Sequence, residues 1–191
     1  MSIDLSKFKL EAENAVLVVI DIQERLVPAM PQGVYLRMRE TVSLLLNAAE
    51  LLGIPVVTTG QYPKGIGHTV PELAGQCQGT IVEKVSFGCC GEPNFLQAMK
   101  ATGRTQAIIT GMETHVCVYQ TVLGLLEDGY NVHLVRDALT SRNKTDYLAG
   151  VANAEQAGAV VTTAEMALFQ MLQKSTHEQF RAVSKLVKER S

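Results

Sequence analysis

The chain has 191 residues, of which 47% are hydrophobic and 19% are charged. This composition is too apolar for a disordered protein, and the chain lacks the long uncharged runs of a membrane protein. Its 17 Lys and Arg residues against 19 Asp and Glu give a net charge of −2, so no bulk positive field attracts nucleic acid or anionic lipid. We therefore expect one globular domain over residues 1–191 that binds neither nucleic acid nor membranes.

The first residues, MSIDLSKFKLEAEN, show no cationic segment followed by an apolar stretch. Nothing marks the chain for secretion, and we expect it in the cytoplasm. Its four cysteines show no C-x-x-C spacing and are expected to be free thiols, namely Cys77, Cys89, Cys90 and Cys117. A redox protein would need a resolving cysteine, and only the adjacent pair Cys89 and Cys90 could supply one.

Short apolar runs rich in β-branched residues alternate with helical segments. The predicted strands are Ala15–Ile20, Pro55–Thr58, Thr80–Glu83, Gln106–Thr110, Asn131–Val135 and Ala159–Thr162. Their continuous apolarity is typical of strands covered on both faces. The predicted helices between them are Tyr35–Leu52, Pro93–Thr102, His115–Asp128 and Lys144–Gln156. This alternation predicts an α/β fold with a parallel sheet and helices on both faces.

Two further helices are predicted in the tail. The first covers Ala164–Leu172, and the terminal one is capped by Thr176, with Gln179 returning the capping-box hydrogen bond. An apolar stripe on these helices can exceed what one subunit covers, which predicts a homo-oligomer, at least a dimer. The stripe consists of Phe169, Leu172, Phe180, Val183 and Leu186.

Ionisable side chains follow three of the predicted strands. Asp21 follows the first strand, Lys84 the third, and Cys117 comes after the fourth. Because ligands of an open parallel sheet bind beyond the carboxyl ends of its strands, these groups can form a nucleophile with its base and an electrostatic partner. Each also has a structural alternative. Asp21 can be a turn residue, Lys84 a solvated charge beside Glu83, and Cys117 a small buried apolar residue.

The segment around Cys117 predicts a strand end, a turn and a helix that begins at or just before the thiol. A helix N-terminus lowers the pKa of a cysteine and offers backbone N–H groups to an anion. With Lys84 nearby, we expect the pKa of Cys117 to lie below its usual value of about 8.5, with Asp21 opposing this shift as a like charge.

No metal or cofactor site is predicted. The four histidines (His68, His115, His133 and His177) show neither i,i+4 nor H-x-H spacing. The glycine-rich stretches fit neither a dinucleotide-binding fingerprint nor a phosphate-binding loop. We expect no metal, no cofactor and a small-molecule substrate.

With these residues in place, the chain resembles the isochorismatase-like cysteine hydrolases over nearly its whole length. Four segments carry the resemblance: VVIDIQERL, EKVSFG, TGMETHVCVYQTVLGLLEDGYNVHLVRDALTSR and GAVVTTAEMALFQML. The segments QYPKGIGHTVPEL and KSTHEQFRAVSKLVK are most similar to the branch called isochorismatase domain-containing proteins. The resemblance implies a three-layer α/β/α, Rossmann-like fold whose parallel six-stranded sheet has the strand order 3-2-1-4-5-6. In that order Lys84 starts well away from the fourth strand, so its long side chain or a bend in the chain must close the gap.

The resemblance also implies residue roles. Cys117 attacks a carbonyl-type carbon, Asp21 accepts the thiol proton and later activates water, and Lys84 holds the aspartate. A cis peptide bond between Met112 and Glu113 is implied as well, with the backbone N–H groups of Glu113 and Cys117 directed at an oxyanion. The expected walls of the substrate pocket are Gln23, Leu26, Tyr62, Phe87, His115 and Tyr119.

Two departures from better-known members of this family favour one chemistry. The metal-binding Asp-x-His…His loop of nicotinamidases is replaced here by TTGQYPKGIGHT, in which only His68 remains. Isochorismatases that cleave a vinyl ether often lack the cysteine, whereas Cys117 is present here. We therefore interpret the chain as a metal-independent cysteine hydrolase that acts on a small amide, carbamoyl or related compound through a covalent thioester. A catalytically weak binding or scaffold protein, a vinyl-ether hydrolase and a redox thiol protein stay open as alternatives.

Overall fold

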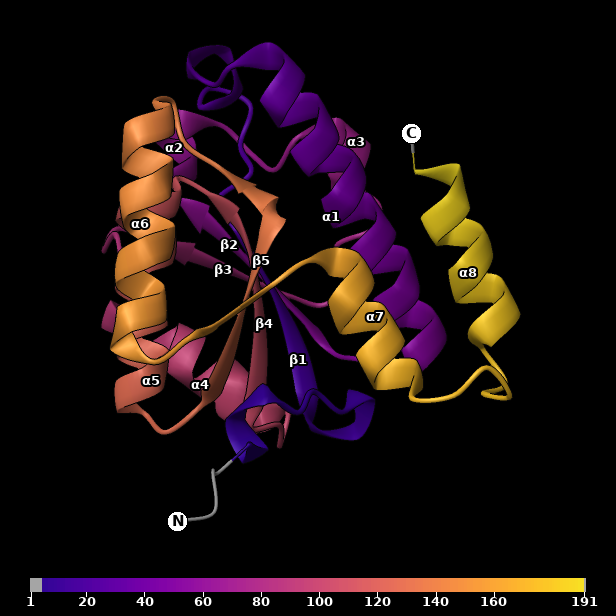
Figure 1. Cartoon of the computed structure of the whole chain (residues 1–191). Helices are drawn as coiled ribbons and strands as arrows, with labels where there is room; N and C mark the ends of the chain where they lie inside the picture. The colour runs from indigo at the N-terminus through magenta and orange to yellow at the C-terminus, as the bar shows by residue number, and fades with distance from the viewer. Residues whose placement is uncertain (1–4, 191) are drawn as a thin grey trace.

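The structure is a computed structural model that describes residues 5–190. At its centre lies a six-stranded parallel sheet with the order β3-β2-β1-β4-β5-β6 (Figure 1). The strands are β1 (Ala15–Ile20), β2 (Val56–Gln61), β3 (Thr80–Lys84), β4 (Gln106–Met112), β5 (Asn131–Thr140) and β6 (Val160–Thr162). The predicted α/β class and strand order are both confirmed.

Helices cover both faces of the sheet and make the three layers (Figure 1). One face carries α1 (Gln32–Leu52), α7 (Ala164–Leu172) and α8 (Phe180–Glu189), and the other carries α4 (Pro93–Ala101), α5 (Tyr119–Glu127) and α6 (Lys144–Ala157). Two short helices, α2 (Pro63–Ile66) and α3 (Pro71–Ala74), lie between β2 and β3. Within residues 5–190, no helix combines the length and apolarity needed to cross a membrane.

The central strand β1 explains why its sequence reads as an unbroken apolar run. Leu17 and Val19 belong to the core beneath α1, whereas Val16, Val18 and Ile20 belong to the core on the opposite face. Because successive side chains of a strand point to opposite faces, a strand covered on both sides is apolar at every position. All six residues of β1 are buried.

Strand register brings the carboxyl ends of the inner strands together. Ile20, the last residue of β1, is paired with Thr59 of β2 and with Gly111 of β4. At the next ladder, Gln61 of β2 is paired with Lys84, which is therefore the last residue of β3 and not the residue after it. The residues that follow β1 and β4 thus share one edge of the sheet with Lys84.

The strand β5 is longer than predicted. Its apolar run was expected to end at Val135, where Arg136 and Asp137 follow, but the strand continues through the buried residues Ala138–Thr140. The pairing of β5 with β4 shifts in register between Ile109 and Gly111, which indicates a β-bulge. A bulge re-aims side chains, and here it lets two charged residues interrupt the apolar pattern within a strand.

The prediction of a capping box at the start of the terminal helix is wrong. The helix α8 begins at Phe180, and its N-cap residue Gln179 makes no side-chain capping hydrogen bond. Residues 174–179 form turns instead, and the backbone N–H of Gln179 is already bound by Nδ1 of His177 at 3.1 Å. Thr176 lies too far before the first helical residue to cap it.

The apolar stripe of the tail is largely covered within the same chain. Leu172 and Val183 are buried, and Phe180 and Leu186 pack against the core beneath α1. Only Phe169 keeps a substantial exposed surface, and its ring meets that of Phe180 edge-on at 6.2 Å between centroids. The argument for a homo-oligomer based on this stripe is therefore wrong, because the stripe is part of the subunit core.

Candidate active site

A buried ion pair joins two of the three predicted site residues. The carboxylate Oδ2 of Asp21 lies 2.7 Å from Nζ of Lys84, and neither side chain is exposed. Asp21 directly follows β1 and Lys84 ends β3, with β2 between these strands, so the lysine side chain spans the end of β2. The long side chain closes the gap that the strand order leaves. The alternative interpretation of Lys84 as a solvated surface charge is therefore wrong.

Two side chains of β2 hold the ion pair in place. The hydroxyl of Thr59 donates to Oδ1 of Asp21 at 2.8 Å, and Nζ of Lys84 donates to Oε1 of Gln61 at 2.6 Å. Sequence reasoning missed both residues because it ended this strand at Thr58. The signal was a run of polar residues, TTGQ, at the carboxyl end of a strand beside β1.

The surroundings keep Lys84 charged. Its Nζ also donates to the backbone carbonyls of Ser86 at 3.2 Å and Phe87 at 2.9 Å. Burial alone lowers the pKa of Lys84, but attraction by Asp21, with smaller contributions from nearby thiols, outweighs that effect and the pKa lies above its usual value. The site therefore contains a fixed ammonium beside a carboxyl group.

Asp21 has a left-handed backbone with a φ of 50°, a conformation that Asp tolerates better than most residues. The chain turns sharply out of β1 at this point while the side chain stays fully buried. Asp21 therefore forms a turn after β1 and also contributes its side chain to the candidate site.

Cys117 lies on a turn that starts from β4 and leads into α5. Residues Thr114–Val118 form a π-helical turn, so the thiol sits within this turn and not at the first residue of an ordinary α-helix. The Met112–Glu113 peptide bond before it is cis. The Thr114 hydroxyl donates to the backbone carbonyl of Thr140 at 2.9 Å, which ties the turn to the end of β5.

The pKa of Cys117 is shifted opposite to the expectation. Burial and, to a smaller extent, the charge of Asp21 raise it to about 12, and the opposing effect of Lys84 offsets this only in part. The side chain is 7% exposed, so loss of solvation dominates over any benefit from a helix N-terminus. A thiol with so high a pKa is neutral at pH 7, and it lies near enough to Asp21 for the charge of that carboxylate to affect it.

A second buried thiol lies in the same region. The Sγ of Cys89 donates to the hydroxyl of Thr59 at 3.8 Å, and its pKa is raised to about 11, chiefly by burial and then by Asp21. The neighbouring Cys90 has a pKa raised to about 12, again mainly by burial. All four cysteines are free, and neither member of the adjacent pair has the lowered pKa of a reactive thiol.

Glu113 is held by an arginine that sequence reasoning also missed. Its buried carboxylate accepts hydrogen bonds from Nε, Nη2 and the backbone N–H of Arg142, which follows β5. Burial alone raises the pKa of Glu113, but the hydrogen bonds from Arg142 outweigh it and lower the pKa. This fork fixes the turn between β4 and Cys117 against the end of β5.

The six expected pocket residues differ in burial and in their contacts. Gln23 is buried, and its side-chain amide is hydrogen-bonded to backbone groups. Its Nε2 donates to the carbonyl oxygens of Gln61 at 3.0 Å and Gly67 at 2.6 Å, and its Oε1 accepts from the backbone N–H of Gln61 at 2.8 Å. Leu26 packs against the core beneath α1, whereas Cys117 belongs to the core on the other face. Both residues therefore have structural roles here.

The other four lie nearer the surface. Tyr62 is 54% exposed and Phe87 is 57% exposed, and the backbone of each is hydrogen-bonded to Lys84. His115 and Tyr119 are partly buried, and Nδ1 of His115 lies 3.0 Å from Oγ of Ser141. Within residues 5–190, no three His, Cys, Asp or Glu side chains are grouped so that they could hold a metal ion.

The layered parallel sheet defines a Rossmann-like α/β protein. A thiol, a carboxyl group and an ammonium lie at the carboxyl edge of this sheet. The sequence profile described as the isochorismatase domain matches residues 15–166. The chain therefore belongs to the isochorismatase family, a family of hydrolases.

Known proteins of the family align with most of this chain. Isochorismatase domain-containing protein 2 from Bos taurus is 37% identical over 180 residues, which cover 93% of this chain and 85% of the relative. The solved structure of a MAR1 ribonuclease from Caenorhabditis elegans is 37% identical, with a TM-score of 0.89, and covers 94% of this chain and 92% of its own. The structure of YcaC from Pseudomonas aeruginosa with hexane-2,5-diol and covalent acrylamide is 25% identical, with a TM-score of 0.85. The match covers 94% of this chain and 96% of that one.

Proposed function

We propose that the protein is a metal-independent cysteine hydrolase that acts on a small amide, carbamoyl or related compound, with Cys117 as nucleophile, Asp21 as base and Lys84 as its electrostatic partner. The observation that carries this proposal is the buried Asp21–Lys84 ion pair beside the Cys117 thiol. Such a pair costs free energy to bury, and it lies where ligands of this fold class bind.

The proposed reaction has two steps. In the first, Sγ of Cys117 bonds to the carbonyl carbon while its proton moves to Asp21, and the backbone N–H groups of Glu113 and Cys117 stabilise the oxyanion. The C–N bond then breaks, the amine leaves with the proton from Asp21, and a thioester remains. In the second step Asp21 takes a proton from water, whose oxygen attacks the thioester carbon. The acid departs and the proton returns to Cys117.

The raised pKa of the Cys117 thiol explains why the reaction needs Asp21 as a base. A cysteine with a pKa of about 12 carries almost no thiolate at pH 7, so attack requires a base that removes the proton as the bond forms. Asp21 is the carboxylate that acts on this thiol, because its charge helps to raise the thiol pKa. Lys84 neutralises the negative charge of Asp21, which would otherwise repel a second negative charge developing on the thiol or on the substrate.

The relative from Pseudomonas aeruginosa suggests a probe for a reactive nucleophile. That structure contains covalent acrylamide, an amide whose alkene accepts a nucleophile. Acrylamide is therefore a suitable probe for this chain, and we expect one adduct per chain, on Cys117 and not on Cys77, Cys89 or Cys90. Peptide mapping by mass spectrometry identifies the labelled residue.

Replacement of Asp21 separates a catalytic thiol from a merely buried one, because the two cases predict opposite signs. If Asp21 is the base, Asp21→Asn slows acrylamide addition to Cys117. If Asp21 acts only as a neighbouring charge that raises the thiol pKa, the same replacement speeds the addition. Faster labelling in Asp21→Asn, at an unchanged fold, would favour the catalytically weak binding or scaffold protein.

A second candidate activity is RNA cleavage, because the relative from Caenorhabditis elegans is described as a MAR1 ribonuclease. The net charge of −2 argues against RNA as the substrate of this chain. Incubation with a fluorescent RNA, in parallel with a panel of small amides, tests both activities. Cleavage of RNA that is lost in Cys117→Ala would replace the amide hydrolase proposal.

A homo-oligomer remains part of the proposal, on a different surface from the tail stripe. Three large exposed side chains flank Lys84: Tyr62, Val85 at 73% exposure, and Phe87. Exposed apolar groups gathered in one place often mark an interface, and a second copy seated here would shield the site. Sedimentation of wild type and Val85→Glu tests this, and a monomer of wild type at micromolar concentration would disprove it. The cytoplasmic location stays a prediction.

A further inference from the structure

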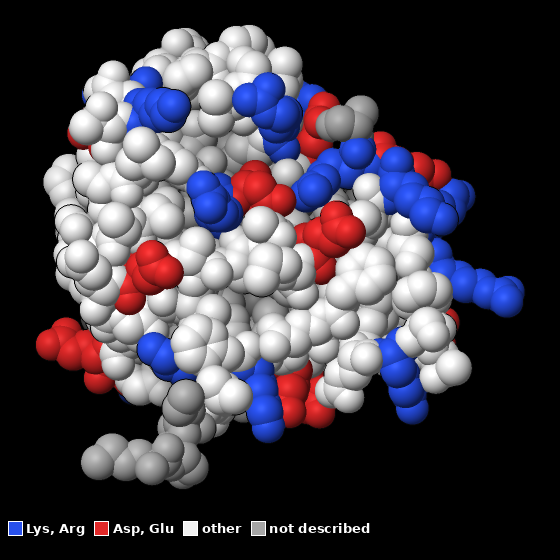
Figure 2. All heavy atoms as spheres, viewed as in Figure 1, with Lys and Arg blue, Asp and Glu red and all other residues white. Residues whose placement is uncertain are grey.

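A cavity opens between α1, β5 and α6, beside the cluster of Asp21, Lys84 and Cys117. Its volume is about 690 Å³, within the range of about 300–1,000 Å³ that small-molecule sites occupy. None of these three residues lines it, and neither does any of the six expected pocket residues. Figure 2 shows the molecule hollowed on the face of this view, with both basic and acidic side chains around the hollow.

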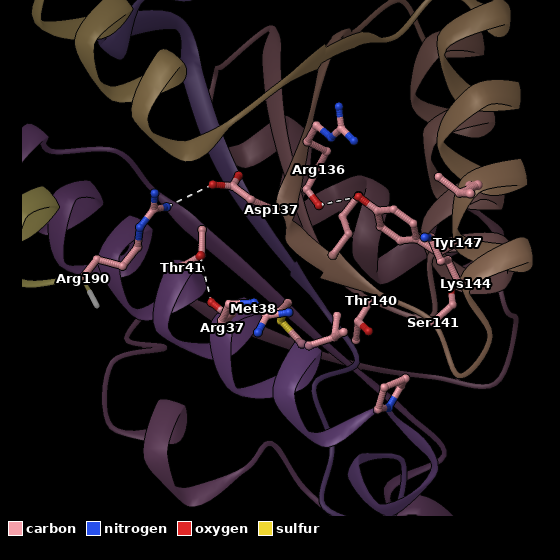
Figure 3. A pocket seen from close by; sticks show the side chains of 14 residues that line it. Arg37, Met38, Thr41, Arg136, Asp137, Thr140, Ser141, Lys144, Tyr147 and Arg190 are labelled. Atoms are coloured by element: carbon pink, nitrogen blue, oxygen red, sulfur yellow. Dashed lines mark hydrogen bonds and ion pairs between the residues drawn. The ribbon is translucent and has the colours of Figure 1, made fainter.

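Basic side chains from three elements line the cavity without a carboxylate partner. They are Arg37 of α1, Arg136 of β5 and Lys144 of α6 (Figure 3). Among the described residues none of these three forms an ion pair. The acidic Asp137 is already engaged, by Arg190 at 3.0 Å and by the backbone N–H of Ala164 at 2.9 Å. The cavity therefore carries uncompensated positive charge.

Thr140 also lines the cavity, but its Oγ1 has almost no exposed surface and is not offered to a ligand there. The amino ends of α1 and α6 also meet this cavity at Pro31 and Lys144, and neither helix has a side-chain cap. Free backbone N–H groups at helix N-termini favour an anion.

The floor of the cavity is apolar. Met38 and Leu139 are buried beneath it, between the basic residues of the rim. We infer that this cavity binds a small organic anion, whose carboxylate meets the three free basic side chains and whose aromatic or branched body packs on Met38 and Leu139. The apolar floor distinguishes this ligand from a bare inorganic ion, which would leave Met38 and Leu139 without a contact.

The cavity also touches the turn that carries the nucleophile. Ser141 lines the cavity, and its Oγ lies 3.0 Å from Nδ1 of His115. His115 belongs to the same π-helical turn as Cys117. This site is separate from the hydrolase chemistry proposed above, because neither Asp21, Lys84 nor Cys117 lines it.

Calorimetric titration of the wild-type protein with 2-naphthoate tests the inference. We expect one site per chain, and binding at least tenfold weaker for 2-naphthalenemethanol, which keeps the ring but lacks the charge. Arg37→Gln and Arg136→Gln should each weaken naphthoate binding about fivefold, as loss of one solvent-accessible charge contact predicts. Added salt should weaken it as well.

Two controls keep the test specific. Arg104→Gln removes an arginine before β4, at the opposite edge of the sheet, and should leave the affinity unchanged. Cys117→Ala, which removes the proposed nucleophile, should also bind naphthoate as wild type does. Equal binding of the neutral analogue, or unchanged affinity in both Arg37→Gln and Arg136→Gln, would overturn the inference. Loss of binding in Cys117→Ala would place the ligand in the active site and overturn it too, whether or not hydrolysis is detected.

Discussion

The ammonium of Lys84 reaches the carboxylate of Asp21 across the end of a whole strand, and 2.7 Å separates the two atoms. Neither side chain retains exposed surface, so each charge depends on the other for its compensation. In a buried pair, removal of one partner leaves the other unpaired and costs about 3–5 kcal/mol, whereas removal of both can be nearly neutral. The pair can therefore be tested without an assay of activity.

We expect Lys84→Met to lower the free energy of unfolding by about 3 kcal/mol or more, because Asp21 is left as an uncompensated buried charge. The double variant Asp21→Asn/Lys84→Met should recover most of this loss. Urea unfolding followed by circular dichroism measures all forms. Additive effects of the two replacements would show that the residues are not coupled, and the site would have to be redrawn.

Turnover should depend on the thiol and on its proton acceptor. Once a substrate is found in the amide panel, Cys117→Ala and Asp21→Asn should each reduce kcat at least about 100-fold, as loss of a nucleophile or a base predicts. Cys90→Ala is the matched control, since this thiol is partly buried and has a similarly raised pKa but lies outside the ion pair. Chelators should leave kcat unchanged. More than about one per cent residual activity in Cys117→Ala would exclude it as the nucleophile.

The alternation of strands and helices and the place of Asp21 could be predicted because they follow from local patterns, whereas the strand order was implied by the family resemblance. The apolar run of β1 ends at Asp21, and a parallel sheet places that end at the ligand edge. The pairing of Lys84 with Asp21 was implied by the resemblance, but the sequence did not show whether the side chain or a bend in the chain would span β2. The partners Thr59 and Gln61 were missed for the same reason: their role appears only when β2 and β3 are in register.

The electrostatics of Cys117 were predicted with the wrong sign because a sequence shows charges but not solvation. The neighbouring Lys84 was identified correctly, yet burial of the thiol dominates its pKa. The basic cavity was not predicted either. Its residues come from α1, β5 and α6, and Arg136 reaches it from the stretch of β5 where the register with β4 shifts, which the apolar pattern did not reveal.

A glycine opposite the last residue of β1 sets how closely the two central strands approach. Gly111 has a φ of 119°, and a Cβ at this position would lie 2.0 Å from the carbonyl oxygen of Ile20. We expect Gly111→Ala to destabilise the protein strongly, because the clash is with backbone and cannot be relieved by a side-chain rotation. Gly103→Ala is the matched control: its φ is also positive, at 67°, but the new Cβ meets nothing within 4 Å. It should cost only about 1–2 kcal/mol. Similar losses in thermal unfolding of the two variants would contradict this account.

A buried histidine makes stability depend on pH. His133 lies inside β5 with 1% exposure, and burial lowers its pKa to about 4, although a hydrogen bond with the backbone of Lys9 opposes the shift. Its Nε2 has no partner among the described residues. In the unfolded chain the imidazole has its ordinary pKa of about 6.5, so between these two values the unfolded state binds more protons.

Stability should therefore rise with pH across this interval, and acidification from pH 7 toward pH 4 should remove about 3 kcal/mol through this residue alone. His133→Leu removes the titrating group and should flatten the dependence between pH 6.5 and pH 5, above the range in which carboxylates contribute most. The measurement is urea unfolding at several pH values. His177→Gln serves as the control, because this histidine lies in the turn before α8 and not in the sheet. A slope that is the same in wild type and His133→Leu would mean that His133 can be protonated within the folded protein.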